Sequence, residues 1–164
     1  MGVNIIYIMG VSGSGKTTIG KLLSEKISIP FFDADEFHST ANKEKMKTGK
    51  PLTDEDRSGW LITLNQLARE QQEKQGAIIA CSALKEKYRK ILSAGIAAPV
   101  IWVFLQGNYE LILERMKTRT GHFMPPEMLS SQFETLETPS KAITVDVAGS
   151  PEKIVATVIS KIHS

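Results

Sequence analysis

Several features that mark other protein classes are missing from this sequence of 164 residues. It has one cysteine, Cys81, so no internal disulfide can form, and this favours a reducing compartment. No apolar run approaches the roughly 20 residues that span a bilayer, and no basic segment precedes the first apolar run. Its 20 basic and 18 acidic residues nearly balance, whereas a nucleic-acid surface needs a clustered basic face. We therefore expect a cytoplasmic protein that binds neither membrane nor nucleic acid.

The sequence also lacks repeats and linkers, and strand-like and helix-like patterns alternate along it. Apolar runs predict strands at 3–9, 31–33, 77–80, 100–105 and 143–147. Apolar spacing and capping residues predict helices at 16–27, 60–68, 84–93, 111–116 and 127–137, and a last helix beginning at Ser150-Pro151. Thr53 is the expected N-cap of the second helix, with Asp56 completing a capping box.

The predicted strands are nearly continuous apolar runs rather than alternating ones. This pattern is typical of a parallel sheet that helices cover on both faces. Strands that alternate with helices indicate an α/β layered fold. We expect a single domain over residues 1–164.

What the sequence does contain is a phosphate-binding motif. Residues 10–17 match G-x-x-x-x-G-K-[ST] and lie between a predicted strand and a predicted helix. Such a loop points backbone N–H groups at phosphate oxygens, Lys16 reaches the β- and γ-phosphates of ATP, and the Thr17 hydroxyl ligates Mg²⁺. The bland alternative is a glycine-rich turn with an exposed lysine. The predicted nucleotide-binding residues are Gly10, Val11, Ser12, Gly13, Ser14, Gly15, Lys16, Thr17 and Thr18.

Signatures of the other P-loop classes are weak or absent. The strand at 77–80 runs into Cys81-Ser82, not into the acidic residue of an ATPase motor. Residues 56–59 fit the GTPase pattern D-x-x-G by letters, but no strand precedes them. Residues 42–45 lack the aspartate that reads guanine. We therefore expect a kinase.

Asp33 and Asp35 end the second predicted strand, at the sheet edge where ligands bind in such folds. On extended chain the two carboxylates point to opposite sides. We assign Asp33, with Thr17, to Mg²⁺ and Asp35 to the acceptor hydroxyl, as its orienter or general base. The alternative is an acidic surface turn.

Several segments together resemble the gluconate kinase family. They are 33–38, 42–46, 49–52, 54–57, 60–61, 81–85, 88–89, 119–123 and 131–137. The resemblance covers nearly the whole chain and implies ATP-dependent phosphorylation of D-gluconate to 6-phospho-D-gluconate, and a homodimer. It also implies a three-layer α/β/α P-loop fold, related to shikimate kinase, whose five parallel strands run in the order 2-3-1-4-5. One departure is Ala34, where the family commonly has glycine.

Residue chemistry suits a hydroxylated carboxylate as the acceptor. Arg57 can clamp a carboxylate, Lys85 and Arg89 add donors, and His38 and Asn42 can read hydroxyls. Alternatives remain: Arg57 can pair with Asp54 or Asp56, and Arg89 with Glu86. The resemblance completes the predicted substrate residues, which are Asp35, His38, Arg57, Lys85, Arg89, His122 and Gln132.

Residues 118–126 have the composition of a mobile lid, with Gly121 and a Pro125-Pro126 pair. We expect Arg119 to act catalytically on the ATP phosphates and Arg115 to lie beside adenine, with 149–151 as the opposite wall. The alternative is that both arginines lie on the solvent-exposed face of a helix and bind no ligand. Two other functions stay open. One is a kinase of another small acceptor, such as shikimate, a different sugar acid or a nucleoside monophosphate. The other is a nucleotide-dependent binding module without transfer activity.

Overall fold

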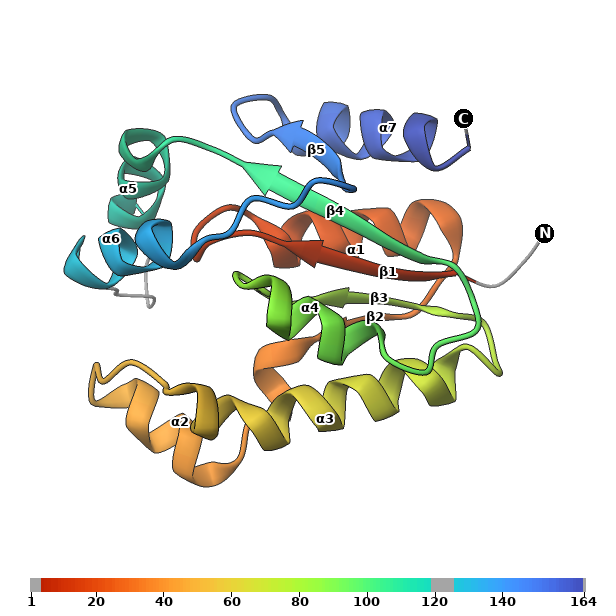
Figure 1. Ribbon diagram of the computed structural model, residues 1–164. Coiled ribbons are helices and arrows are strands. Elements are labelled where there is room, and N and C mark those ends of the chain that lie inside the picture. Colours follow the sequence, from red (N-terminus) through yellow and green to blue (C-terminus); the bar gives the residue numbers. More distant parts are fainter. Residues whose placement is uncertain (1–3, 119–125, 164) are drawn as a thin grey trace.

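The computed structural model describes residues 4–118 and 126–163, and its framework is a sheet of five parallel strands (Figure 1). The strands are β1 (Ile5–Met9), β2 (Phe31–Asp33), β3 (Ala77–Ala80), β4 (Val100–Gln106) and β5 (Ile143–Asp146). Their order is β2-β3-β1-β4-β5, which confirms the order that the resemblance implied. β1 is central, with Ile5 opposite Ala77 of β3 and Val100 of β4.

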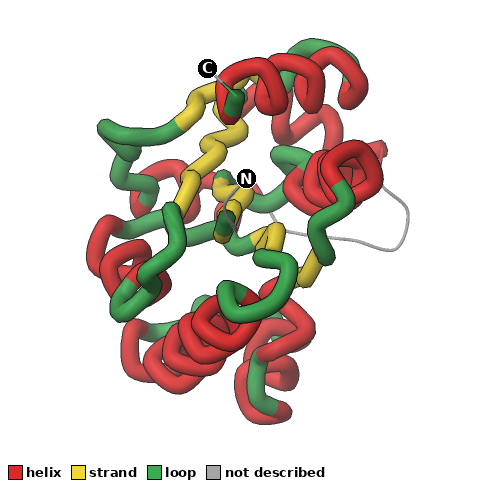
Figure 2. The backbone as a smooth tube through the Cα atoms, turned by 90° about the vertical axis from the view of Figure 1, so that its right-hand side faces the viewer, coloured by secondary structure: helices red, strands yellow, loops and turns green. Residues whose placement is uncertain are grey.

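Helices lie on both sides of the strands (Figure 2). They are α1 (Lys16–Ile27), α2 (Thr40–Lys47), α3 (Asp54–Gln71), α4 (Glu86–Ser93), α5 (Tyr109–Thr118), α6 (Pro126–Thr135) and α7 (Pro151–Ile162). A short 3-10 helix, η1 (Ala34–Phe37), follows β2. Within 4–118 and 126–163, no helix combines the length and the apolar character needed to cross a membrane.

The sheet separates two apolar clusters because successive side chains of a strand point to opposite faces. One cluster contains Ile6, Ile8, Ile19, Leu23, Val155 and Val158. The other contains Ile5, Tyr7, Met9, Trp60, Leu64 and Leu92. Thus α1 and α7 cover one face and α3 and α4 the other, which confirms the three-layer arrangement.

Capping explains several of the helix boundaries. Thr53 and Asp56 form the expected capping box at the start of α3. The Ser150 side chain accepts a hydrogen bond from the Lys153 N–H, and Pro151 occupies the first turn of α7. α4 begins two residues later than expected, because Lys85 has an extended backbone and is the N-cap.

Two elements, η1 and α2, were not predicted from the sequence. α2 buries only Asn42, so it has no apolar stripe from which a helical period could be read. Its start is set by Ser39, whose Oγ accepts a hydrogen bond from the Asn42 N–H at 3.1 Å. η1 is too short to show a period, and it changes how the two aspartates of the site are presented.

Candidate active site

The phosphate-binding loop lies where the sequence placed it, between the end of β1 and the start of α1. Gly13 has φ +81°, and a Cβ there would lie 2.7 Å from Cγ of Met116, so a side chain at position 13 would have to displace the Met116 side chain of α5. Gly15 is the N-cap of α1 with φ +98°, and a Cβ there would meet nothing within 4 Å. The loop therefore packs closely against α5 at Gly13, whereas the space beside Gly15 is open.

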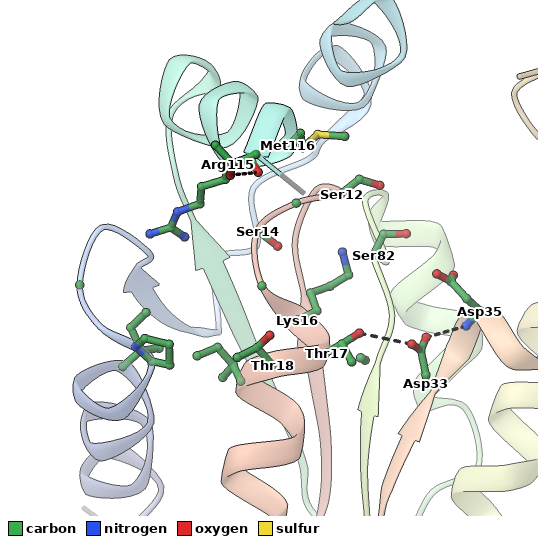
Figure 3. Close-up of a pocket in the computed structure, with 18 residues that line it drawn as sticks. Ser12, Ser14, Lys16, Thr17, Thr18, Asp33, Asp35, Ser82, Arg115 and Met116 are labelled. Atoms are coloured by element: carbon green, nitrogen blue, oxygen red, sulfur yellow. Dashed lines mark hydrogen bonds between the residues drawn. The ribbon is translucent and has the colours of Figure 1, made fainter. Parts of the chain in front are cut away.

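A cavity of about 700 Å³ lies over this loop (Figure 3). The loop lines its floor, and Asp33, Asp35 and Ser82 lie at one end. Arg115 and the turn at Gly149 and Pro151 line it as well. The cavity thus joins the predicted phosphate, metal and adenine-side residues with Asp35 along one crevice, at the carboxyl ends of the strands. Of the other predicted substrate residues in the described part of the chain, His38, Arg57, Lys85 and Gln132 do not line it.

Lys16 extends across the loop from the first turn of α1. Its Nζ donates to the carbonyl oxygens of Gly10, at 3.1 Å, and Val11, at 3.0 Å. These contacts hold the ammonium group inside the loop, where phosphates are expected.

Thr17, Asp33 and Asp35 form a continuous chain of contacts (Figure 3). Thr17 Oγ1 donates to Asp33 Oδ2 at 3.3 Å, and Asp33 Oδ1 accepts the Asp35 N–H at 3.0 Å. Asp33 is thereby the N-cap of η1. The expectation that the two carboxylates project from extended chain to opposite sides is wrong: Asp35 lies in the first turn of η1, and both residues line the same cavity.

The electrostatics of the crevice favour Asp35 as a proton acceptor. Desolvation in the crevice raises the pKa of Asp35, the charge of Asp33 raises it further, and Lys16 lowers it. A carboxylate whose pKa is raised above the ordinary aspartate value is a better general base near neutral pH.

The donor set at Thr17 and Asp33 fits Mg²⁺, which binds through a few hard oxygen ligands together with substrate phosphates and waters. No group of three or more histidine, cysteine, aspartate or glutamate side chains in the described part of the chain could hold a metal by itself. A hydroxyl and a carboxylate in contact beside a phosphate loop are therefore the fitting donors.

Ala34 keeps an ordinary backbone at the position where the resemblance led us to expect glycine. Its φ is not positive, so alanine is not strained. It is fully buried, and its carbonyl oxygen accepts a hydrogen bond from Trp60 Nε1 at 2.7 Å. Trp60, which begins the apolar spacing of the helix predicted at 60–68, therefore also holds the backbone between the two aspartates.

Arg57 and Lys85 come together around Tyr88 on the acceptor side. The guanidinium carbon of Arg57 lies 5.4 Å from the Tyr88 ring centroid and Lys85 Nζ lies 5.7 Å from it. Arg57 also donates to the Tyr88 hydroxyl at 3.2 Å and to the Leu52 carbonyl at 2.8 Å. Two cations predicted to bind a carboxylate are thus grouped by one aromatic residue.

The carboxylate of Asp54 adds a negative charge to this group of cations. Its carboxylate accepts hydrogen bonds from the Tyr88 hydroxyl and from Lys87, and it lies 3.7 Å from Lys85 Nζ. The hydrogen bonds from Lys87 and Tyr88 hold the pKa of Asp54 far below its usual range. Burial, with the Asp54 contact, raises the pKa of Tyr88 to about 12, so Tyr88 stays a neutral donor.

Arg89 is buried and its guanidinium group binds backbone carbonyl oxygens. It is 8% exposed, and it donates to the carbonyl oxygens of Ala83, at 2.7 Å, and Glu137, at 2.8 Å. It lies outside the large cavity and lines a smaller one of about 370 Å³. Its expected role with the substrate stays a prediction.

Gln132, on α6, contacts the phosphate loop. Its Oε1 accepts the Ser12 N–H at 2.7 Å and its Nε2 donates to Ser12 Oγ at 3.1 Å. Arg115 donates to the Val147 carbonyl, next to the turn at 149–151 that was expected to face it across adenine. Arg119 and His122 lie outside the described residues.

Asp54, Tyr88 and Ser82 are site residues that the sequence alone hardly indicates. Asp54 looked like a surface partner of Arg57, and Tyr88 counted only as part of a resembling segment. The useful signal was position, because Ser82 and Lys85 directly follow β3, whose carboxyl end adjoins that of β2.

Comparisons with known proteins agree with this geometry. A sequence profile of the family described as shikimate kinase matches residues 12–163. The probable gluconokinase of Mus musculus is 43% identical over 175 residues, covering 94% of this chain and 95% of that protein. The thermosensitive gluconokinase of Escherichia coli (strain K12) is 48% identical over 133 residues, covering 80% and 71%.

A solved structure extends the likeness to three dimensions. The crystal structure of a gluconokinase from Sinorhizobium meliloti 1021 has a TM-score of 0.90 and 38% identity, and the match covers 98% of this chain and 91% of that one. The structural match thus spans nearly the whole chain. The chain belongs to the gluconokinase family, within the wider shikimate kinase family of P-loop kinases.

Proposed function

We propose that this protein transfers the γ-phosphoryl group of ATP to the primary hydroxyl of D-gluconate, giving 6-phospho-D-gluconate and ADP. The observation that carries the proposal is similarity to gluconokinases along nearly the whole chain. The grouping of Arg57 and Lys85, on the side of the sheet where Asp35 lies, supports a carboxylate acceptor.

On the nucleotide side, the N–H groups of residues 10–17 and the ammonium of Lys16 bind phosphate oxygens. Arg115 lies on the adenine side, and Arg119 contributes a positive charge to the transferring phosphoryl group. Thr17 and Asp33 would hold Mg²⁺, which when bound neutralises phosphate charge.

On the acceptor side, Asp35 orients the primary hydroxyl of gluconate and accepts its proton. The hydroxyl oxygen forms a bond to the γ-phosphorus as the bond from that phosphorus to the bridging oxygen of ADP breaks. Arg57 and Lys85 bind the gluconate carboxylate, and His38 donates to one of its hydroxyls. His122 and Gln132 complete the proposed acceptor residues.

The test is ADP release with a panel of acceptors: D-gluconate, shikimate, two other sugar acids and no acceptor. Because phosphoryl transfer needs a positioned hydroxyl, we expect D-gluconate to raise the rate at least about 100-fold over acceptor-free hydrolysis. Mass spectrometry of the product gives the second readout, the addition of one phosphoryl group to gluconate.

The same panel separates the alternatives. If shikimate were the preferred acceptor, the proposed substrate would be wrong and the proposed kinase activity would stand. Shikimate is included because the chain matches the shikimate kinase family. Nucleotide binding without stimulation by any acid would instead indicate a binding module. We also expect a cytoplasmic homodimer that binds no nucleic acid, and light scattering of the purified chain measures its oligomeric state.

A further inference from the structure

His38 lies three residues after Asp35 in the chain and is almost enclosed by protein. It follows η1, and its backbone N–H faces the Asp35 carbonyl at 3.5 Å. Only 8% of its surface is exposed, and its ring stacks on Trp60 with centroids 4.1 Å apart and planes 16° apart. Since Trp60 also holds the carbonyl of Ala34, the position of His38 is tied to that of Asp35.

Asn42 determines which nitrogen of this ring can carry a proton. It is 6% exposed, and its Nδ2 lies 2.8 Å from the Asp56 carbonyl oxygen and 3.3 Å from His38 Nδ1. The group that faces a carbonyl oxygen must be the NH₂, because an amide oxygen there would meet another acceptor. Its second hydrogen is then directed at His38 Nδ1, which must accept, so the ring proton lies on Nε2.

The surroundings also keep the ring neutral. Burial lowers the pKa of His38 to about 4, and the charges of Arg57 on α3 and Lys43 on α2 act in the same direction. A second ring proton would lie on Nδ1 and would point at the N–H of the Asn42 amide, so that two donors would face each other. The nearby carboxylates offer little compensation, because Asp56 pairs with Lys45 at 2.5 Å and Asp35 lies in η1, on the crevice side.

His38 Nε2 is available to a ligand. No hydrogen bond to it is made within 4–118 and 126–163. It is also not among the buried polar atoms without a partner in that part of the chain, where Ser14 Oγ alone qualifies. The ring therefore presents one N–H donor at the surface of an otherwise satisfied, enclosed side chain.

We propose that Asn42 is a positioning residue that fixes His38 as a neutral imidazole, whose Nε2–H donates to a hydroxyl oxygen of the acceptor. This inference rests on the proposed function for the identity of the acceptor, and on the contacts above for the tautomer. It also restricts the expectation that Asn42 reads hydroxyls itself to its Oδ1 as an acceptor, because both of its amide hydrogens are used inside the protein. A neutral N–H donor favours an uncharged hydroxyl oxygen of the acceptor at this position. The carboxylate of the acceptor binds instead to the cations around Tyr88.

The first experiment is independent of activity. Nitrogen-15 NMR of the histidine-labelled full chain, from pH 8 to pH 5, reports the protonation of each ring nitrogen. We expect His38 to stay neutral with its proton on Nε2 across this range. In Asn42→Asp, a carboxylate faces Nδ1, so we expect a proton on Nδ1 and a His38 pKa above that of the wild type. A wild-type His38 with its proton on Nδ1 would overturn the proposal.

The second experiment measures KM for gluconate and for ATP. For Asn42→Asp we expect about a tenfold rise in the gluconate KM, the size of one lost hydrogen bond, with the ATP KM within about twofold. Glutamine can place an amide N–H near the position of Nε2 and asparagine cannot. His38→Gln should therefore raise the gluconate KM several-fold less than His38→Asn does. Equal effects of the two would contradict the donor role even if Asn42→Asp failed to fold.

Asn65→Asp is the matched control. Asn65 is 8% exposed, and its Nδ2 also donates to backbone carbonyls, those of Leu92 at 3.0 Å and Ala94 at 2.8 Å. Among the described residues it makes no hydrogen bond to a histidine. It should lower stability without changing the His38 tautomer or the gluconate KM. A selective rise in the gluconate KM here would show that the Asn42 effect is general destabilisation. If the panel identifies another acid, KM is measured for that acid, and the NMR outcome is unaffected.

Discussion

At the scale of single residues, Asp35 depends on a local turn more than on its place in the strand. The 3-10 turn after β2 brings its carboxyl into the same cavity as Asp33, and Trp60 fixes the carbonyl between them. The closeness of the two charges and the desolvation of the crevice both raise the pKa of Asp35. A general base with these surroundings loses its function in acid at a higher pH than an ordinary aspartate.

Replacing Asp35 by asparagine tests that role. We expect Asp35→Asn to lower kcat by about 10²- to 10⁴-fold, the usual contribution of a general base, while the Kd for ATP changes little. The measurement pairs steady-state ADP release with calorimetric titration of the nucleotide. In the wild type, the acid limb of kcat/KM should lie above pH 3.8, the ordinary value for aspartate, because the shift is upward.

Glu36→Gln is the control for this change, since Glu36 is the adjacent acidic residue on η1 and is exposed. It should leave kcat near the wild-type value. Full turnover in Asp35→Asn would remove Asp35 from the chemistry and leave it only a part in binding.

Cys81 is a buried core residue. It is 2% exposed at the end of β3, and burial raises the pKa of its thiol to about 12. A thiol that stays protonated is a weak nucleophile, so Cys81 acts as a small apolar residue of the core.

At the scale of secondary-structure elements, one junction joins the chain after α6 to the start of α4. The Glu137 N–H donates to the Leu84 carbonyl at 2.7 Å, and Glu137 Oε1 accepts the Glu86 N–H at 2.8 Å. Arg89 adds hydrogen bonds to the carbonyls of Glu137 and Ala83. Ala83 has φ +46°, an unfavourable conformation for alanine, which this junction must stabilise.

Arg89→Met tests whether this arginine belongs to the junction. Two carbonyls of the junction would lose a charged donor, so we expect the free energy of unfolding to fall by about 2–4 kcal/mol in urea titrations. The ratio of the gluconate KM to the ATP KM should stay near the wild-type ratio. Lys90→Met, at an exposed position of the same helix, should change the free energy of unfolding by less than about 0.5 kcal/mol. A selective rise in the gluconate KM of Arg89→Met would instead support the substrate role expected for Arg89 from the sequence.

At the scale of the whole molecule, the buried neutral His38 links stability to pH. Its pKa is 6.5 in model compounds and about 4 in the folded protein. Between these values the unfolded chain binds more protons than the native one, so stability falls as the pH falls from 6.5 towards 4. From these two values, lowering the pH from 7 to 4.5 costs about 2 kcal/mol of unfolding free energy through this residue.

His38→Gln removes this titration. The loss of stability between pH 7 and pH 4.5, measured by urea unfolding, should therefore be smaller in the variant by about 2 kcal/mol. Taking the difference between the two proteins in this loss of stability cancels the contribution of the carboxylates, because they titrate in both proteins. Parallel pH profiles for the two proteins would mean that His38 is not held neutral in the native state.

The sequence by itself determined the parts that depend on local order along the chain. Apolar runs and caps located the five strands and most helices, because burial and capping act over a few neighbouring residues. The loop at 10–17 and the strand-end aspartates followed from motif and position, and the resembling segments pointed to the family.

Only the tertiary structure decided what each polar side chain does. Arg89 and Gln132 bind groups 48 and 120 residues away, Asn42 sets the proton position on His38, and Tyr88 gathers the acceptor cations. A cationic or amide side chain can serve a ligand or a backbone carbonyl with the same chemistry. Which of these it meets depends on the packing of distant segments, and no local pattern records that.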